Sequence, residues 1–106
     1  MSESKHRKAF EDFADRAQEE LGNSLQKLVL YGSVARGDET RRSDVDVFAV
    51  VEDGDDLDIL RDLAFDVGVM EHGVSISVQG RVTDEFEGFS ETSYLRNVER
   101  DGVEYA

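Results

Sequence analysis

The sequence predicts an α+β fold in which helices pack against a small mixed β-sheet. Three observations predict this class. Apolar residues recur at helical spacing in two stretches, short apolar runs bounded by glycine indicate strands, and helical and strand-like segments alternate along the 106 residues. A chain of this length accommodates one modest core, so residues 1–106 are expected to form a single domain.

The first half of the chain predicts one long helix, two strands and a short helix between them. Apolar residues at helical spacing followed by a stop at Gly22-Asn23 predict the long helix, and they are Ala9, Phe10, Phe13, Ala14, Ala17 and Leu21. Residues 28–31 form an apolar run that ends at Gly32, which is typical of a buried strand. Residues 33–36 can form the short helix. Residues 44–51 begin with alternation and become wholly apolar, which predicts a central strand.

The second half predicts another helix and a third strand. Residues 53–56 form a turn that can cap a helix, which ends near Gly73 and whose inward residues are Leu57, Leu60, Ala64 and Val67. Residues 74–78 alternate strictly between apolar residues and Ser75 and Ser77, as a strand with one apolar face does. The signals weaken after Gly80. We expect a helical turn after Thr83, a helix over residues 93–100 and a last strand over residues 103–105.

Composition narrows the classes of function. Acidic residues outnumber basic ones by 25 to 12 and the net charge is -13, which disfavours direct binding to nucleic acid or to anionic membranes. The absence of cysteine excludes disulfides, thiolate metal sites and cysteine nucleophiles. No apolar run reaches the length of a membrane span, and no secretory signal is visible, so a soluble cytoplasmic protein is expected. The many carboxylates also predict adaptation to high salt, with an ordinary acidic domain as the alternative.

Two aspartates at the start of the predicted central strand are the strongest candidates for chemistry. Residues two apart on a strand point to the same side, so Asp44 and Asp46 present their carboxylates together while Val45 and Val47 face the other way. Neighbouring carboxylates repel each other, and a cation between them relieves that repulsion. Oxygen ligands without His or Cys favour Mg²⁺ or Mn²⁺, and Mg²⁺ usually binds through one or two carboxylates together with substrate phosphates. The alternative is a pair of solvated residues on an edge strand.

A glycine-serine turn before these aspartates can hold the phosphates. Gly32 lets the backbone approach a phosphate closely, and Ser33 adds a hydroxyl and a free N–H at the start of the short helix. Gly37 allows the chain to turn out of this helix. Arg36 can contact a phosphate or brace the loop, and Ser43 can cap the turn into the strand or orient Asp44. Alone, Gly32-Ser33 would more often be a plain turn.

Other polar residues are expected to lie outside the site. Arg41 and Arg42 are expected to be solvated, although either could contact a phosphate. His6 and His72 lack partners at metal-ligand spacing, and we expect them at the surface or at a helix end.

The motif resembles that of a known family. Gly32-Ser33, Ala35-Arg36-Gly37 and Ser43-Asp44-x-Asp46 are similar to the signature of the DNA polymerase beta superfamily of nucleotidyltransferases, specifically its minimal stand-alone members. The resemblance covers nearly the whole chain. It implies a palm-like nucleotidyltransferase fold, nucleotide binding by the glycine-serine turn, and Asp44 and Asp46 as catalytic metal ligands. The implied donor is ATP or another nucleoside triphosphate, which transfers its nucleoside monophosphate to a hydroxyl group.

The resemblance also implies a protein partner, and this chain departs from the family's pattern at the third metal-binding carboxylate. Stand-alone members are commonly paired with a small helical HEPN-type toxin, so an antitoxin that modifies or covers such a protein is expected. Active members carry a third carboxylate on the next strand, where this chain has Ser75 and Ser77, and a serine hydroxyl is a poor ligand for Mg²⁺. Either Asp84 or Glu85 replaces that carboxylate and AMP is transferred, or the domain binds nucleotide and neutralises its partner by contact.

Overall fold

The computed structural model describes residues 4–83 and 102–105. Within these residues, strands β1 (Leu25–Tyr31), β2 (Val45–Val51), β3 (Ile76–Val82) and β4 (Val103–Glu104) form one sheet in the order β3-β2-β1-β4. β1 runs antiparallel to β2 and β4, whereas β2 and β3 are parallel. The predicted mixed sheet is therefore confirmed, and β2 lies inside it between β1 and β3.

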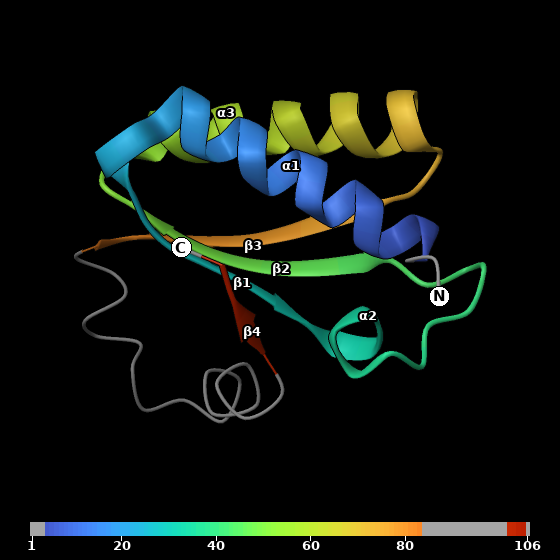
Figure 1. The fold of residues 1–106 in the computed structure, drawn as a ribbon. Coiled ribbons are helices and arrows are strands. Elements are labelled where there is room, and N and C mark those ends of the chain that lie inside the picture. Colours follow the sequence, from blue (N-terminus) through green and yellow to red (C-terminus); the bar gives the residue numbers. More distant parts are fainter. Residues whose placement is uncertain (1–3, 84–101, 106) are drawn as a thin grey trace.

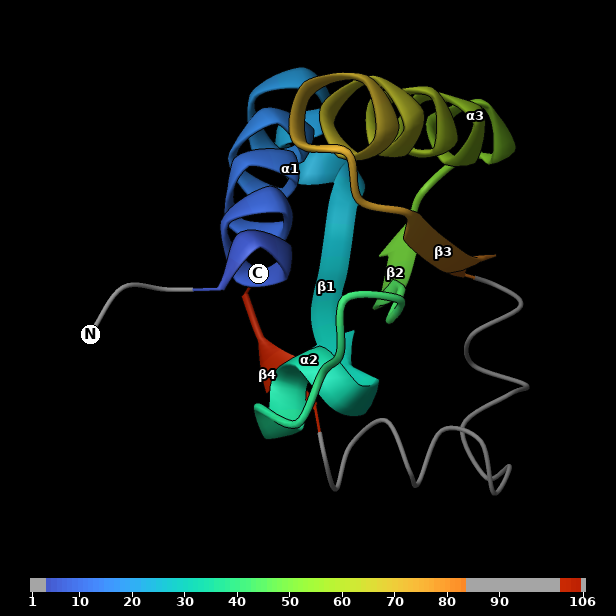
Figure 2. The same ribbon diagram turned by 90° about the vertical axis from the view of Figure 1, so that its right-hand side faces the viewer.

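Two long helical segments cover one face of this sheet (Figures 1 and 2). The first is α1 (Lys5–Leu21), whose N-terminus is capped by Ser4, because the Ser4 Oγ accepts a hydrogen bond of 3.0 Å from the backbone N–H of Arg7. A single 3₁₀ turn, η1 (Gly22–Ser24), leads from α1 into β1. The second segment is α3 (Gly54–Leu63), which begins with a reciprocal capping box between Asp53 and Asp56. It continues without a break as the π-helical segment η2 (Ala64–His72).

The core lies between the sheet and these helices. It consists of alternate residues of β1 and β2 packed against the apolar sides of α1, α3 and η2. The largest of its fully buried side chains are Phe10, Phe13, Leu28, Leu30, Val34, Val45, Val47, Val51, Leu60 and Val67. Because strand side chains alternate, the residues between the core positions point to the opposite face, which carries Val29, Phe48 and Asp46.

The short helix α2 (Gly32–Arg36) follows β1 directly and lies at the end of the sheet where β2 begins (Figure 1). It starts one residue earlier than the sequence predicts, at Gly32. β1 itself starts at Leu25, three residues before the predicted run, because Leu25 still pairs with Val51 across a register shift. In the described residues, no helix has the length and apolar character needed to cross a bilayer.

The third strand is displaced from its predicted position. We expected residues 74–78, but β3 begins at Ile76 and extends to Val82. The backbone N–H of Val74 donates to the Gly68 carbonyl at 2.9 Å, so the residue after Gly73 still belongs to the turn out of η2. At the other end, the strand passes through Gly80, where a Cβ atom would collide with the Leu57 side chain of α3. Gly80 therefore permits a close helix-strand contact and does not end the strand.

The last predicted strand is confirmed as β4, and the Tyr105 backbone N–H continues the pairing with a 2.8 Å hydrogen bond to the Leu28 carbonyl. The Tyr105 ring contacts Phe10 edge to face, with ring centroids 5.6 Å apart. The predicted helix over residues 93–100, and the turn expected beyond Thr83, lie outside the described residues.

Candidate active site

The two aspartates stand where β2 begins. Val45 and Val47 are completely buried in the core, and Asp46 between them is half-buried on the opposite face of the sheet. Asp44 precedes the first residue of β2 and is exposed. The strand period thus separates the carboxylates from the valines as predicted, and the central position of β2 rules out the alternative of a solvated edge strand.

Gly32 lies directly against Asp46. Its φ angle is +78°, a left-handed conformation that L-residues with side chains rarely adopt. A Cβ atom at this position would fall on the Asp46 Oδ2 and lie 3.3 Å from both Cβ and Cγ of Asp46. Two independent restrictions, backbone conformation and lack of space, therefore require glycine here. The contact brings the glycine-serine turn and the second aspartate into one site.

The electrostatics of this site favour a bound cation. Burial raises the pKa of the Asp46 carboxyl, the neighbouring Asp44 charge raises it further, and the Arg36 guanidinium opposes both effects. A divalent cation between the two carboxylates would reverse the first two effects, since it stabilises the charged form. Both donors are oxygens, which suits Mg²⁺ or Mn²⁺. In the described part of the chain, no group of three or more His, Asp or Glu side chains forms a metal cluster, so the pair would leave coordination positions for substrate oxygens.

The turn after β1 leads directly into the short helix α2. Ser33 is half-buried in the first turn of α2, where backbone N–H groups have no acceptor within the helix. Gly37 ends α2 in a left-handed conformation with φ of +78°, and the Asp38 N–H donates to the Ser33 carbonyl at 3.0 Å. The predicted role of Gly37 as the residue that turns the chain out of α2 is confirmed.

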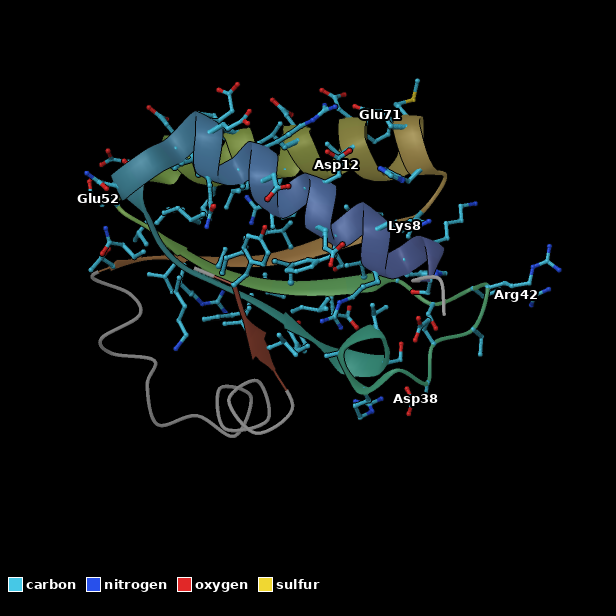
Figure 3. The ribbon with its side chains drawn as sticks, viewed as in Figure 1. Lys8, Asp12, Asp38, Arg42, Glu52 and Glu71 are labelled. Atoms are coloured by element: carbon cyan, nitrogen blue, oxygen red, sulfur yellow. The ribbon has the colours of Figure 1, made fainter. Side chains whose placement is uncertain are left out.

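Arg36 and Ser43 brace the loop that carries Asp44. The Arg36 Nε lies 3.4 Å from the Asp38 Oδ2, at the exposed end of α2. The Ser43 Oγ accepts a hydrogen bond of 2.9 Å from the Thr40 backbone N–H, so it closes the loop just before Asp44. Figure 3 shows Asp38 beyond α2 and Arg42 directed away from the body of the protein. Contact of Arg36 or Ser43 with a nucleotide stays a prediction.

A row of side chains crosses the sheet at Asp46. Tyr31 of β1 and Ser77 of β3 both pair with Asp46 in register, and paired residues share a face. Ser77 therefore lies beside Asp46, and it is one of the two serines on the strand where the resemblance implies a third carboxylate. Ser75 does not belong to this row. It precedes β3, its carbonyl accepts a hydrogen bond of 2.8 Å from the Val45 backbone N–H, and it lines a groove together with Phe65 and Val69 of η2. Asp84 and Glu85 lie outside the described residues.

Sequence reasoning overlooked Tyr31 as a neighbour of the site. Its position before Gly32 was visible, but the register that places it beside Asp46 comes from the pairing of β1 with β2. His6 lies in the first turn of α1, at a helix end as expected, but it is buried, with 7% of its surface exposed. His72 lies at the end of η2 as predicted, with its Nε2 3.1 Å from the Asp12 Oδ2.

Comparison with known proteins identifies the family. Residues 7–104 match the model of the nucleotidyltransferase domain family. A protein of Methanocaldococcus jannaschii, provisionally named a protein adenylyltransferase, is 32% identical over 96 residues, which cover 90% of this chain and 92% of that protein.

Solved structures show the same fold. A crystal structure of a toxin-antitoxin with AMP-PNP superimposes with a TM-score of 0.58 at 19% identity, over 89% of this chain and 70% of that one. A MntA-HpeT toxin-antitoxin variant, in which two aspartates two positions apart are replaced by glutamate, gives 0.60 at 18% identity with the same coverage. The family match, the relative and the shared fold agree with the geometry of the site, and this chain belongs to the nucleotidyltransferase domain family of enzymes.

Proposed function

We propose that this protein transfers AMP from Mg-ATP to a hydroxyl group of a protein partner. The observation that carries the proposal is the contact between Gly32 and the Asp46 carboxylate, because it joins a phosphate-binding turn to a pair of metal-binding carboxylates. An isolated pair of aspartates would indicate only a metal site. Together with the glycine-serine turn, the pair fits a metal-bound triphosphate.

Each residue of the motif has a separate task in this proposal. Asp44 and Asp46 hold the metal, whose positive charge would stabilise the attacking and leaving oxygens of the transferred phosphoryl group. Gly32 permits close approach of the triphosphate, and Ser33 donates its hydroxyl and backbone N–H to it. Arg36 lies close enough to Asp46 to lower the pKa of that carboxyl, which also places its positive charge near the phosphates. The acceptor oxygen attacks the α-phosphorus, pyrophosphate leaves and the hydroxyl proton is released.

Relatives support the choice of donor and acceptor. One structural neighbour is a toxin-antitoxin with AMP-PNP, a nucleotide analogue of ATP. The relative from Methanocaldococcus jannaschii is named as a protein adenylyltransferase. The neighbours are toxin-antitoxin assemblies, which supports a protein partner. We therefore propose a small helical HEPN-type toxin as the partner and an antitoxin role for this chain. Its acidic composition further supports work in a cytoplasm of high salt concentration.

A second function is favoured by one observation, the in-register pairing of Ser77 with Asp46. A serine hydroxyl neither binds Mg²⁺ well nor acts as a general base near neutral pH. In this alternative, the domain binds Mg-ATP with little or no catalysis and neutralises its partner by contact. The two functions share the nucleotide site and differ only in the fate of the α-phosphate.

The test follows the α-phosphate of ATP. The protein is incubated at high salt with Mg²⁺, a small helical HEPN-type toxin as the proposed partner, and ATP labelled in either the α- or the γ-phosphate. AMP transfer leaves the α-label on protein and no γ-label, whereas phosphorylation would do the reverse. The Asp46→Asn variant is expected to lose the transfer. Asp58→Asn is the matched control, since it removes the same charge from an exposed position on α3.

Three results would decide between the functions. Transfer of the α-label that depends on Asp46 supports the enzyme. Absence of transfer together with measurable binding of Mg-ATP rejects the enzyme and supports the binding module. Absence of both transfer and binding rejects both proposals.

A further inference from the structure

Exposed apolar side chains are unevenly distributed between the two long helical segments. In the described residues, α1 exposes no large apolar side chain, whereas α3 and η2 expose Ile59, Phe65, Val69 and Met70. Phe65 is 55% exposed and Val69 is 43% exposed. A single exposed apolar residue is ordinary, but a group of them on one segment is typical of an interaction surface.

Phe65 and Val69 form one wall of a groove at the edge of the sheet. The groove has a volume of about 260 Å³, and its other wall includes Ile76 and Val78 of β3, which is an edge strand of the described sheet. The other side of η2 is covered, because Glu71 accepts hydrogen bonds of 2.7 and 2.9 Å from an arginine of α1. Figure 2 shows α1 and α3 next to each other, with α3 on the side of β3. The groove therefore lies where a third helix would extend the helix layer.

A row of acidic residues borders this groove. Asp58, Asp62 and Asp66 are all exposed, and residues four apart on a helix lie on the same side. Arg61, Phe65 and Val69 repeat at the same spacing and line the groove, so the two rows run next to each other along α3 and η2. The acidic row carries three negative charges, against one positive charge from Arg61 in the groove wall.

Charge and geometry indicate what kind of segment fits. Asp62 and Asp66 each follow a buried residue by two positions, which places them on the side of the helix away from the sheet. A strand added to β3 would lie in the plane of the sheet, below this acidic row. A helix beside η2 would contact the apolar wall with one face and the acidic row with its flank. A second copy of this chain is disfavoured, because each copy has a net charge of -13.

We propose that the groove between η2 and β3 binds an amphipathic helix of a partner protein. The apolar face of this helix packs on Phe65 and Val69, and lysine or arginine side chains on its flank pair with Asp62 and Asp66. Binding requires neither nucleotide nor metal. The inference goes beyond AMP transfer and does not depend on the proposed function.

The test uses a peptide of about 20 residues in which leucines at helical spacing form one face and lysines the remainder. Its binding is measured by calorimetry at about 0.15 M salt without nucleotide or divalent metal. Phe65→Ser is expected to weaken binding at least about tenfold, because it removes an aromatic anchor, and Val69→Ser should weaken it in the same direction. Ile59→Ser is the matched control, since Ile59 is exposed on α3 and does not line the groove. Melting curves verify that each variant folds.

The charge of the acidic row is tested separately. The double variant Asp62→Asn/Asp66→Asn is expected to weaken binding several-fold, and this difference should disappear at about 1 M salt, where ion pairs are screened. Glu19→Gln/Glu20→Gln is the control, because it removes the same charge from exposed positions on α1. NMR signals of the wild type should shift on peptide binding at residues 61–70 and 76–78.

Several results would overturn the proposal. Equal losses in the two double variants would show only an effect of overall charge, and equal losses in Phe65→Ser and Ile59→Ser would place the peptide outside the groove. Tighter binding of a peptide in which lysine and leucine alternate would indicate a strand on β3. Dimerisation of the free protein that Phe65→Ser abolishes would make a second copy the occupant. Failure of the helical peptide to bind at about 1 mM would also reject it.

Discussion

Replacing Gly32 by alanine tests how the proposed site is assembled. The left-handed conformation at φ of +78° costs an alanine roughly 1–2 kcal/mol. Alanine also reduces the conformational freedom of the unfolded chain, which offsets about 0.4–1 kcal/mol of this cost. The added Cβ meets the Asp46 carboxylate, which is the movable end of a side chain, and forcing it off its rotamer costs a further 0.5–1.5 kcal/mol or so. The expected net loss of stability is therefore about 0.5–3 kcal/mol.

Gly32→Ala should reduce Mg-dependent ATP binding far more than it reduces the stability of the fold. The carboxylate that must move is a proposed metal ligand, and a displacement of about 1 Å in a catalytic group can cost about a hundredfold in rate. We expect Gly32→Ala to weaken Mg-dependent ATP binding at least about tenfold while the protein still folds. Each kcal/mol corresponds to a melting-temperature decrease of about 4–8 °C in a domain of this size.

The chain supplies a matched control at the other end of α2. Gly37 has the same φ of +78°, but a Cβ atom there meets nothing within 4 Å. Gly37→Ala should therefore show the conformational cost alone and keep nucleotide binding. In an Asp46→Ala background, the extra cost of Gly32→Ala over Gly37→Ala should largely disappear, since the colliding oxygens are gone.

The assay combines thermal unfolding with calorimetric titration of ATP in the presence and absence of Mg²⁺. If Gly32→Ala and Gly37→Ala lose equal stability and both bind Mg-ATP as the wild type does, Asp46 is not held against Gly32. Such a result would refute the proposed assembly of the site.

Three further predictions concern charge. Because the pKa of Asp46 is raised above its ordinary 3.8 in the folded state, ionisation of this group destabilises the native protein. Without metal, Asp46→Asn should match the wild type below about pH 3.8 and become relatively more stable as the pH rises through the folded pKa, in melting curves across pH. Ser77→Asp should destabilise the metal-free protein, increase its thermal stabilisation by Mg²⁺, and raise any AMP transfer several-fold, because a third carboxylate joins the row at Asp46. The melting temperature of the wild type should rise as salt increases to about 1 M, because salt screens the repulsion among the acidic side chains of a protein with net charge -13.

Each of these predictions has a contradicting result. A constant stability difference between Asp46→Asn and wild type at all pH values would mean that folding does not shift the pKa of Asp46. Gln79→Asp is the matched control for Ser77→Asp, since Gln79 is exposed on β3 and pairs with Phe48 instead of Asp46. Equal responses to Mg²⁺ in the two variants would contradict the register of β3. A melting temperature independent of salt would contradict the proposed adaptation to high salt.

The local chemistry of the site could be predicted because it lies within one short stretch of sequence. Asp44 and Asp46 are two residues apart at the start of β2, and the strand period alone puts Asp46 opposite Val45 and Val47. Helix ends were equally predictable, since the stop at Gly22 and the capping of α3 by Asp53 depend on residues next to each other in the chain. The identity of Tyr31 and Ser77 as neighbours of Asp46 was not predictable with the same certainty. These residues approach it only through strand pairing, and the pairing register depends on the whole sheet.

Two glycines show which strand ends could not be predicted from the neighbouring residues. Gly32 follows an apolar run and Gly80 follows an alternating one, and the expected strands ended before both glycines, at residues 31 and 78. The first strand does end before Gly32, and Gly80 lies within β3 because the Leu57 side chain occupies the space where its Cβ would be. His6 is a similar case. Its burial depends on how α1 packs in the folded protein, which no local pattern predicts.

The sequence by itself determined the element types, the acidic surface and the motif that pairs a glycine-serine turn with two aspartates, because each follows from residues close together in the chain. Only the tertiary structure decided that Gly32 touches Asp46, that Ser77 and not Ser75 stands beside it, and that Phe65, Val69, Ile76 and Val78 line one groove. Such contacts join residues far apart in sequence. They depend on how helices and strands pack to bury one common core, and that packing is a property of the whole chain.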